Sequence, residues 1–300
     1  MAVSVLAYLY LVFAVVIFVL GLVQNSTIKL PQILQDTLLY GKSRGKRNEW
    51  TVMRYLEIPK SYFRYFYAVG IVANSAHLAL AVQAYVFGVP PPAIYQQVVS
   101  AVSAEQVTTD ALGTLLCISL MLIQDLRRLY ECYFISVYSK STMNLLHFLL
   151  GFYLYITFGW TVLSEAPSLN TAPLQHLHIG LITWYHIVGV IMFALASWQH
   201  QVAHVTFANL RKTEGKVRNY AHRIPRGGLF EYVSSPHYLM EIIIYLAFAT
   251  VVGLRNISVW SVFVFVLLNQ AVCAILTQKW YLDNYKTYPK SRKTLIPFIY

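Results

Sequence analysis

Side chains that could do chemistry concentrate in one polar stretch of the chain. Residues 199–237 read QHQVAHVTFANLRKTEGKVRNYAHRIPRGGLFEYVSSPH, so histidines, arginines and aromatics alternate there and two glycines, Gly227 and Gly228, are adjacent. Glu241 follows at the start of an apolar segment. A carboxylate in that place is costly unless it is paired or faces a water-filled cavity, which makes Glu241 a candidate site residue. Equally open is the alternative that Glu241 lies at an interface and only pairs with a nearby Arg.

Two histidines in this stretch have the spacing of metal ligands. His200 and His204 stand at i and i+4, which would place both imidazoles on one face of a helix. Membrane desaturases and hydroxylases, however, use several histidine boxes with adjacent histidines, and this sequence contains no His-His pair. His176 and His178 are expected on the opposite side of the membrane. Because ligand number decides such sites, we predict no metal and a polar or phosphate-contacting role for these histidines.

Nucleotide-binding motifs of soluble enzymes are missing from the sequence. No G-x-G-x-x-G follows a strand pattern, and no G-x-x-x-x-G-K-[ST] occurs. A nucleotide would therefore be held by helix ends and loops, where Arg can grip a phosphate with its bidentate fork. The alternative is that the basic residues only fix membrane topology. That alternative explains the Lys and Arg residues but not the interleaved His, Tyr and Asn.

The composition indicates that lipid is the solvent around these residues. Of the 300 residues, 57% are hydrophobic and 12% are charged, against about 25% charged in soluble proteins. A helix needs roughly 20 mostly apolar residues to cross the hydrocarbon core. We therefore predict an all-α, polytopic membrane protein with about seven transmembrane helices in a single domain, 1–300. The predicted spans are 2–23, 66–87, 107–123, 143–163, 177–198, 238–254 and 257–276.

The basic residues give an independent indication of topology. All Lys and Arg residues except Arg255 fall on alternate connections or in the C-terminal tail. By the positive-inside rule those parts are cytoplasmic, so we predict a luminal N-terminus and a cytosolic C-terminus. This distribution accounts for the net charge of +11 and argues against nucleic acid as a partner.

The remaining signals are weaker. The three cysteines, Cys117, Cys132 and Cys273, are far apart and form neither a disulfide framework nor a Cys-x-x-Cys pair. The first apolar segment lacks a basic start and a small-x-small cleavage site, so it is expected to be a retained helix. Asn25 and Asn256 match the glycosylation pattern, but both lie too close to the predicted membrane for modification to be inferred.

Three segments carry a family resemblance. HRIPRGGLFEYVSSPHYLMEI at 222–242, QKWYLDNYKTYPKSRKTLIPFIY at 278–300 and LRRLYECYFISVYS at 126–139 resemble segments of the steroid 5α-reductase family. Together they point to its polyprenol/polyprenal reductase branch. The specific motifs cover 124–139 and 199–300, whereas the first hundred residues match mainly in topology.

The resemblance implies a multi-pass, monomeric reductase of the endoplasmic reticulum membrane that uses NADPH. Its substrate would be a long-chain isoprenoid, and its task the reduction of the α-isoprene double bond of polyprenal or polyprenol for dolichol synthesis and N-glycosylation. Carried over to this sequence, the cofactor residues would be Arg128, His204, Arg211, Arg223, His237 and Arg292. The catalytic residues would be Asp125, Glu241 and Tyr281.

Some positions depart from the steroid-reducing relatives. Asp125 stands where those enzymes carry a tyrosine that hydrogen-bonds the substrate carbonyl, so it would serve only if protonated or by orienting another donor. His204 replaces an acid and Gln278 often a histidine. These departures weigh against a steroid substrate and leave the proton donor open.

Other functions remain open from the sequence. Reduction of the Δ4 bond of a 3-oxo-steroid uses the same electron flow. An isoprenylcysteine-type methyltransferase has a related membrane architecture but would use S-adenosylmethionine. A lipid-binding scaffold would use the basic face for anionic headgroups alone.

Overall fold

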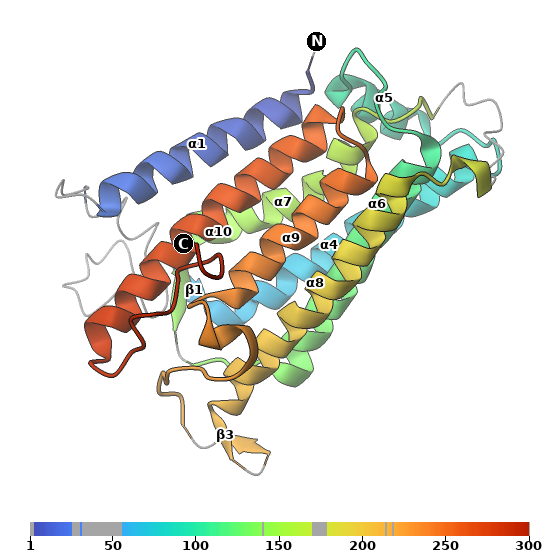
Figure 1. Cartoon of the computed structure of the whole chain (residues 1–300). Coiled ribbons are helices and arrows are strands. Elements are labelled where there is room, and N and C mark those ends of the chain that lie inside the picture. Colours follow the sequence, from blue (N-terminus) through green and yellow to red (C-terminus); the bar gives the residue numbers. More distant parts are fainter. Residues whose placement is uncertain are drawn as a thin grey trace.

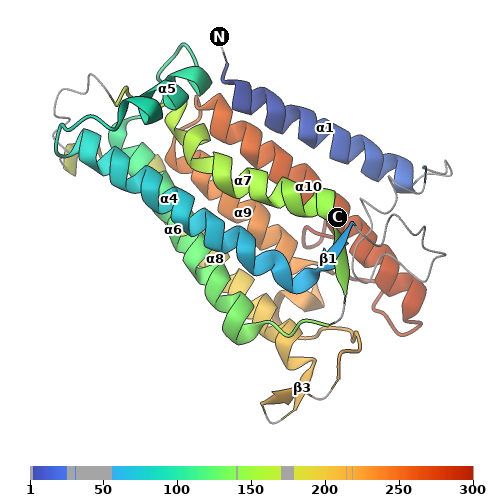
Figure 2. The same cartoon turned by 180° about the vertical axis from the view of Figure 1, so that it is seen from behind.

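The computed structural model is an elongated bundle of helices (Figure 1). It describes residues 3–25, 31, 56–139, 141–169, 179–213, 215–217 and 219–299. The long helices run side by side, with α5 at one end of the bundle and β3 at the other (Figures 1 and 2). The helices are α1 (Val5–Asn25), α4 (Phe63–Tyr85), α5 (Ala93–Val102), α6 (Ala111–Tyr130), α7 (Leu145–Leu163), α8 (Trp184–Asn209), α9 (Pro236–Val251) and α10 (Ile257–Asn284).

The predicted helical class is confirmed, and four helices among the described residues meet length and composition criteria for crossing a membrane. These are Val5–Gln24, Lys60–Tyr85, Leu145–Leu163 and Ile257–Asn284, with Pro236–Val251 as a shorter apolar helix. The helices α6 and α8 are long enough but carry charged and histidine side chains in their second halves. Several basic residues used for the topology argument, including Lys29, Lys42, Lys46 and Lys140, lie outside the described residues, as do His176 and His178.

Helix packing places the elements that later form the site. The α1 helix lies against α10, α4 against α6 and α7, and α8 against α9. Gly189 makes the α8–α9 contact close, because a Cβ there would lie 3.0 Å from the Ala247 carbonyl oxygen. Small residues allow this approach between membrane helices, where packing rather than hydrophobic burial drives association.

Two helices begin later than the spans predicted at their positions, and the helix caps explain why. The helix α8 begins at Trp184, whereas the fifth span was predicted from 177, because Thr183 and His186 form a capping box; the helix continues to Asn209. The polar stretch that begins at 199 is therefore helical in its first part. The helix α6 begins at Ala111, whereas the third span was predicted from about 107, because the Asp110 carboxylate accepts the Gly113 N–H at 2.7 Å and caps the helix.

The tight hairpin between α9 and α10 is confirmed, and it gives Asn256 a structural role. Asn256 is fully buried, accepts the Val259 N–H at 2.8 Å and donates to Thr109 Oγ1 at 2.7 Å. A buried cap is inaccessible in the folded chain, so Asn256 is a structural residue and not a glycosylation site there. The side chain of Asn25 lies outside the described residues.

Short strands and the C-terminal tail complete the end of the bundle at β3. Here β1 (Glu57–Pro59) pairs with β2 (Thr142–Asn144), and β3 (Lys212–Thr213) with β4 (Lys216–Val217), both antiparallel. The C-terminal tail lies against residues 232–234. The Ser234 N–H donates to the Lys293 carbonyl oxygen at 2.8 Å, and the Lys293 N–H donates to the Tyr232 carbonyl oxygen at 2.9 Å.

Candidate active site

A cavity of about 420 Å³ extends into the bundle. Cationic side chains reach it from beyond the helix ends, including Lys60, Arg211 and Arg223, while Leu154, Phe265 and Val266 line it from within helices. Most of the site residues predicted from the sequence lie on its wall; these are Arg128, His204, Arg211, Arg223, His237, Glu241 and Tyr281. The fold thus brings together residues from α6, α8, α9, α10 and the loop after β4.

Glu241 lies at the centre of this group. Its Oε2 lies 3.3 Å from His200 Nε2 and accepts from Gln124 Nε2 at 3.4 Å. The side chain is 13% exposed and lines the cavity. Among the described residues its closest polar partners are thus an imidazole and an amide, which distinguishes it from the alternative of a simple surface pair with Arg.

The protonation of His200 follows from its neighbours. Arg127 Nη2 lies 3.1 Å from His200 Nδ1, and a guanidinium can only donate, so Nδ1 accepts and the imidazole proton sits on Nε2. That N–H faces Glu241 Oε2 and also His204 Nε2, which is 3.3 Å away. Arg127 is fixed in turn by donating to Gln124 Oε1 at 2.7 Å. The polar groups around Glu241 are therefore orientated before any ligand arrives.

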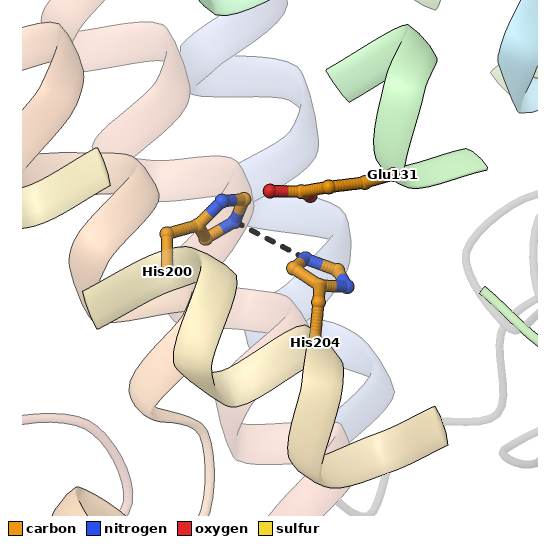
Figure 3. Close-up of side chains that lie close together, drawn as sticks. All are labelled: Glu131, His200 and His204. Carbon is orange, nitrogen blue, oxygen red and sulfur yellow. Dashed lines mark hydrogen bonds between the residues drawn. The ribbon is translucent and has the colours of Figure 1, made fainter. Parts of the chain in front are cut away.

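Glu131, His200 and His204 form a cluster whose side chains have the spacing to ligate a metal ion. Figure 3 shows the two histidines one turn apart on α8, with Glu131 reaching toward them. Their ligand atoms lie within 4.8 Å of one another. Glu131, however, is fully buried and accepts hydrogen bonds from both Arg127 and Arg128. Two fixed guanidinium charges oppose a bound cation, so this geometry favours a polar wall, and the absence of a metal stays a prediction.

Arg128 and Arg211 are held at the cavity by defined partners. Arg128 Nε donates to Tyr67 Oη at 3.1 Å, and its guanidinium also lies 5.2 Å from the Tyr67 ring centroid. Arg211 follows α8 and donates to the Val137 carbonyl. Burial lowers the pKa of Arg211 from its ordinary value, which leaves it a cation at neutral pH. In both arginines, the guanidinium N–H groups that are not used in these contacts can bind an anion.

Asp125 and Arg292 do not lie on the cavity wall. Asp125 is fully buried and its Oδ2 accepts from Asn74 Nδ2 at 2.8 Å. Arg292 is 1% exposed, donates to the Pro225 carbonyl at 2.9 Å and lies 3.3 Å from Glu231 Oε2. The positions of these two side chains do not test a role in catalysis or cofactor binding. Because neither lines the cavity, such a role would act through another residue. Arg292 acts structurally on the loop that carries Arg223.

Several cavity residues were missed by the sequence analysis. The aromatic residues Tyr67, Tyr155 and Tyr245 line the cavity, and so do Asn269 and Gln270 on α10. Adjacent amides inside a long apolar helix are a usable signal, because polar groups at that depth are costly without a function. The tyrosines gave no such signal, since aromatic residues are common in membrane helices.

Comparison with known proteins shows which family the chain resembles. Residues 170–300 match a family model described as 3-oxo-5-alpha-steroid 4-dehydrogenase. A polyprenal reductase from Xenopus tropicalis is 36% identical over 276 residues, covering 90% of this chain and 89% of its own. A zebrafish (Danio rerio) polyprenal reductase is 35% identical over 283 residues, 91% of each chain. The human one is 34% identical over 274 residues, covering 89% of this chain and 86% of its own. On these grounds the chain belongs to the polyprenal reductase branch of the steroid 5α-reductase family.

Proposed function

We propose that this chain is an oxidoreductase that uses NADPH to saturate the α-isoprene double bond of a polyprenal, giving the dolichal level. The observation that carries the proposal is the cavity, which is lined by cationic side chains beyond the helix ends, here called its mouth, by apolar side chains within the helices and by Glu241. Relatives similar along about nine-tenths of the chain are polyprenal reductases, which supports the same substrate class.

The membrane placement is proposed on the basic residues and the helices together. The long helices α1, α4, α6, α7, α8, α9 and α10 correspond to the seven predicted spans. A luminal N-terminus and a cytosolic C-terminus put Arg211, Arg223 and the tail in the cytosol, where a soluble dinucleotide arrives. We place this single, monomeric domain in the endoplasmic reticulum membrane, where a long isoprenoid stays in lipid while its polar head enters the cavity.

The residues present fit a phosphorylated dinucleotide. Arg211 and Arg223 line the mouth, and bidentate Arg forks suit phosphate groups. His237 and Glu241, one turn apart on α9, lie where hydrogen-bonding groups could hold the reactive ring. When bound, the reduced cofactor would supply a hydride. The protein would orientate the reactants and exclude water, which are the main contributions of a protein to cofactor chemistry.

Electron demand selects an aldehyde over an alcohol as the substrate. A hydride with its electron pair must add to an electron-poor carbon. In an allylic alcohol the double bond has no electron sink, whereas in an enal the carbonyl oxygen takes the charge as an enolate. A proton then adds at the α-carbon. Stabilising the negative charge on that oxygen is the interaction by which the site can lower the activation barrier most.

Purified protein tests the proposal directly. With NADPH and a polyprenal, we expect NADPH consumption and a product heavier by two hydrogens. Supplying a 3-oxo-Δ4-steroid in the same assay separates the two conjugated carbonyls, and retention of S-adenosylmethionine instead of NADPH would favour a methyltransferase. Failure to retain NADPH or to consume it with either carbonyl would refute the proposal and favour a lipid-binding scaffold.

A further inference from the structure

Tyr245 is a buried phenol that the fold leaves without an evident structural use for its hydroxyl. It is 2% exposed and lines the cavity. Within the part of the chain that the structure describes, its Oη has no hydrogen-bond partner. Burying a hydroxyl without a partner costs stability, so a ligand group that accepts from it is the natural complement.

The position of Tyr245 on α9 places its side chain near Glu241. Tyr245 lies one turn beyond Glu241, so the two side chains share a helix face, and both line the cavity. The ring packs edge-on against Phe158 and Phe248, at 6.3 and 5.3 Å between centroids, which fixes its direction. The donor is therefore held in place by packing alone.

We propose that Tyr245 is a catalytic residue whose O–H donates a hydrogen bond to the aldehyde oxygen of the bound enal. The inference rests on the proposed function and names the hydrogen-bond donor that the developing enolate oxygen requires. As hydride adds to the β-carbon, the C=C electron pair moves to the Cα–C1 bond and the carbonyl pair moves to oxygen, where Tyr245 stabilises the enolate. After hydride transfer, the α-carbon takes a proton that comes from solvent, so the enal gains one hydride and one proton.

Asp125 does not compete for this role in the described structure. Its carboxylate is engaged with Asn74 and lies off the cavity wall. Tyr67 accepts from Arg128 but keeps its own O–H to donate, and it lines the cavity, as does Tyr155. Tyr67 and Tyr155 are therefore the alternative donors, and both belong in the test.

The test compares Tyr245→Phe with Tyr67→Phe, Tyr155→Phe and Tyr10→Phe. Removing one oxyanion donor typically lowers kcat about 10²- to 10³-fold, so Tyr245→Phe should show that loss with unchanged NADPH affinity and with equal or higher thermal stability, because the hydroxyl it removes has no partner in the fold. Tyr10 is fully buried, bonds to Thr157 Oγ1 at 2.6 Å and does not line the cavity. Tyr10→Phe should therefore lower stability and spare kcat.

A spectroscopic readout tests the hydrogen bond without turnover. A ten-carbon isoprenoid enal bound to wild-type protein without NADPH should show a carbonyl stretching frequency lower than when bound to Tyr245→Phe. Equal frequencies, wild-type kcat in Tyr245→Phe, or a comparable rate loss only in Tyr67→Phe or Tyr155→Phe would overturn the inference. In each of these cases the wild type still reduces enals. If the wild type itself neither binds nor reduces an enal, the proposed function fails instead.

Discussion

The two ends of the bundle use polar side chains for opposite purposes. At the α5 end, Glu165 accepts from the Ser258 N–H at 2.7 Å, from Thr108 Oγ1 at 2.6 Å and from the Ile257 N–H at 3.3 Å. These bonds, together with the Asn256 cap, satisfy the first turn of α10. On the cavity wall, by contrast, Tyr245 Oη has no hydrogen-bond partner among the described residues. The polar groups of Glu165 and Asn256 complete the fold, while the Tyr245 hydroxyl is left for a ligand.

The largest expected effect falls on Glu241. Glu241→Gln keeps the size of the side chain but removes the charge that faces His200. We expect kcat to fall roughly 10²- to 10⁴-fold with little change in thermal stability. Steady-state kinetics and thermal unfolding of the same preparation measure both. Wild-type turnover in this variant would remove Glu241 from the site.

Glu165→Gln is the matched control at the other end. It removes the charge from a buried carboxylate that accepts three hydrogen bonds. Hydrogen bonds to charged groups contribute about 1.5–3 kcal/mol, so the unfolding free energy should fall by about that amount. The kcat of the folded fraction should stay unchanged. A selective loss of kcat without destabilisation would break the contrast between the two ends.

Arg223→Ala tests the mouth of the cavity. Arg223 is exposed and lines the cavity, so its removal should leave the fold intact, and its proposed contribution is to cofactor binding. Removing one charge-assisted hydrogen bond should weaken the NADPH affinity about tenfold, and turnover at limiting NADPH should fall with it. Fluorescence titration measures the affinity. Arg226→Ala, three residues on and not on the wall, is the control and should bind NADPH normally.

The smallest effect concerns the clamp between the tail and the loop. The Gly227 N–H and then Arg292 lower the pKa of Glu231 below its ordinary value of 4.5. Because the folded pKa is depressed, the stabilisation is complete above that value and is lost as pH falls through the folded pKa. Glu231 is 44% exposed, which keeps the effect small. Glu231→Gln should lose about 1 °C in Tm at pH 7 and less as the pH falls to 3. An equal loss at both pH values would exclude this charge effect.

The sequence predicted the helical class, and seven of its nine candidate site residues lie on the cavity wall, because their signals are local. Apolar runs and clusters of polar residues are read directly from the chain, whereas the caps at Asp110 and Asn256 were recognised only in the structure. The direction of a side chain inside an apolar helix is not, since such helices lack a polar face to orientate them. The sequence therefore could not show that the Asp125 side chain hydrogen-bonds Asn74 instead of facing the cavity. Nor could it distinguish Tyr245, which lines the cavity, from an aromatic residue that only packs between helices.

Long-range returns of the chain also escaped prediction. Arg292 is separated from the Pro225 and Glu231 that it contacts by the whole α9–α10 hairpin. The π-helical segment Glu131–Ile135 continues α6 and places Glu131 against the histidines. The pattern of apolar residues in the sequence does not reveal a π-helical turn, so this segment could not be predicted. Such segments often occur at functional sites.

Isotope transfer is the most direct measurement of the central claim, that the cavity brings a reduced dinucleotide to the β-carbon of a conjugated aldehyde. Purified protein would be given a polyprenal and NADPH carrying deuterium at the transferable position of nicotinamide C4. The account predicts a saturated aldehyde with one deuterium on its β-carbon. Deuterium at the carbonyl carbon, with the double bond intact, would contradict it.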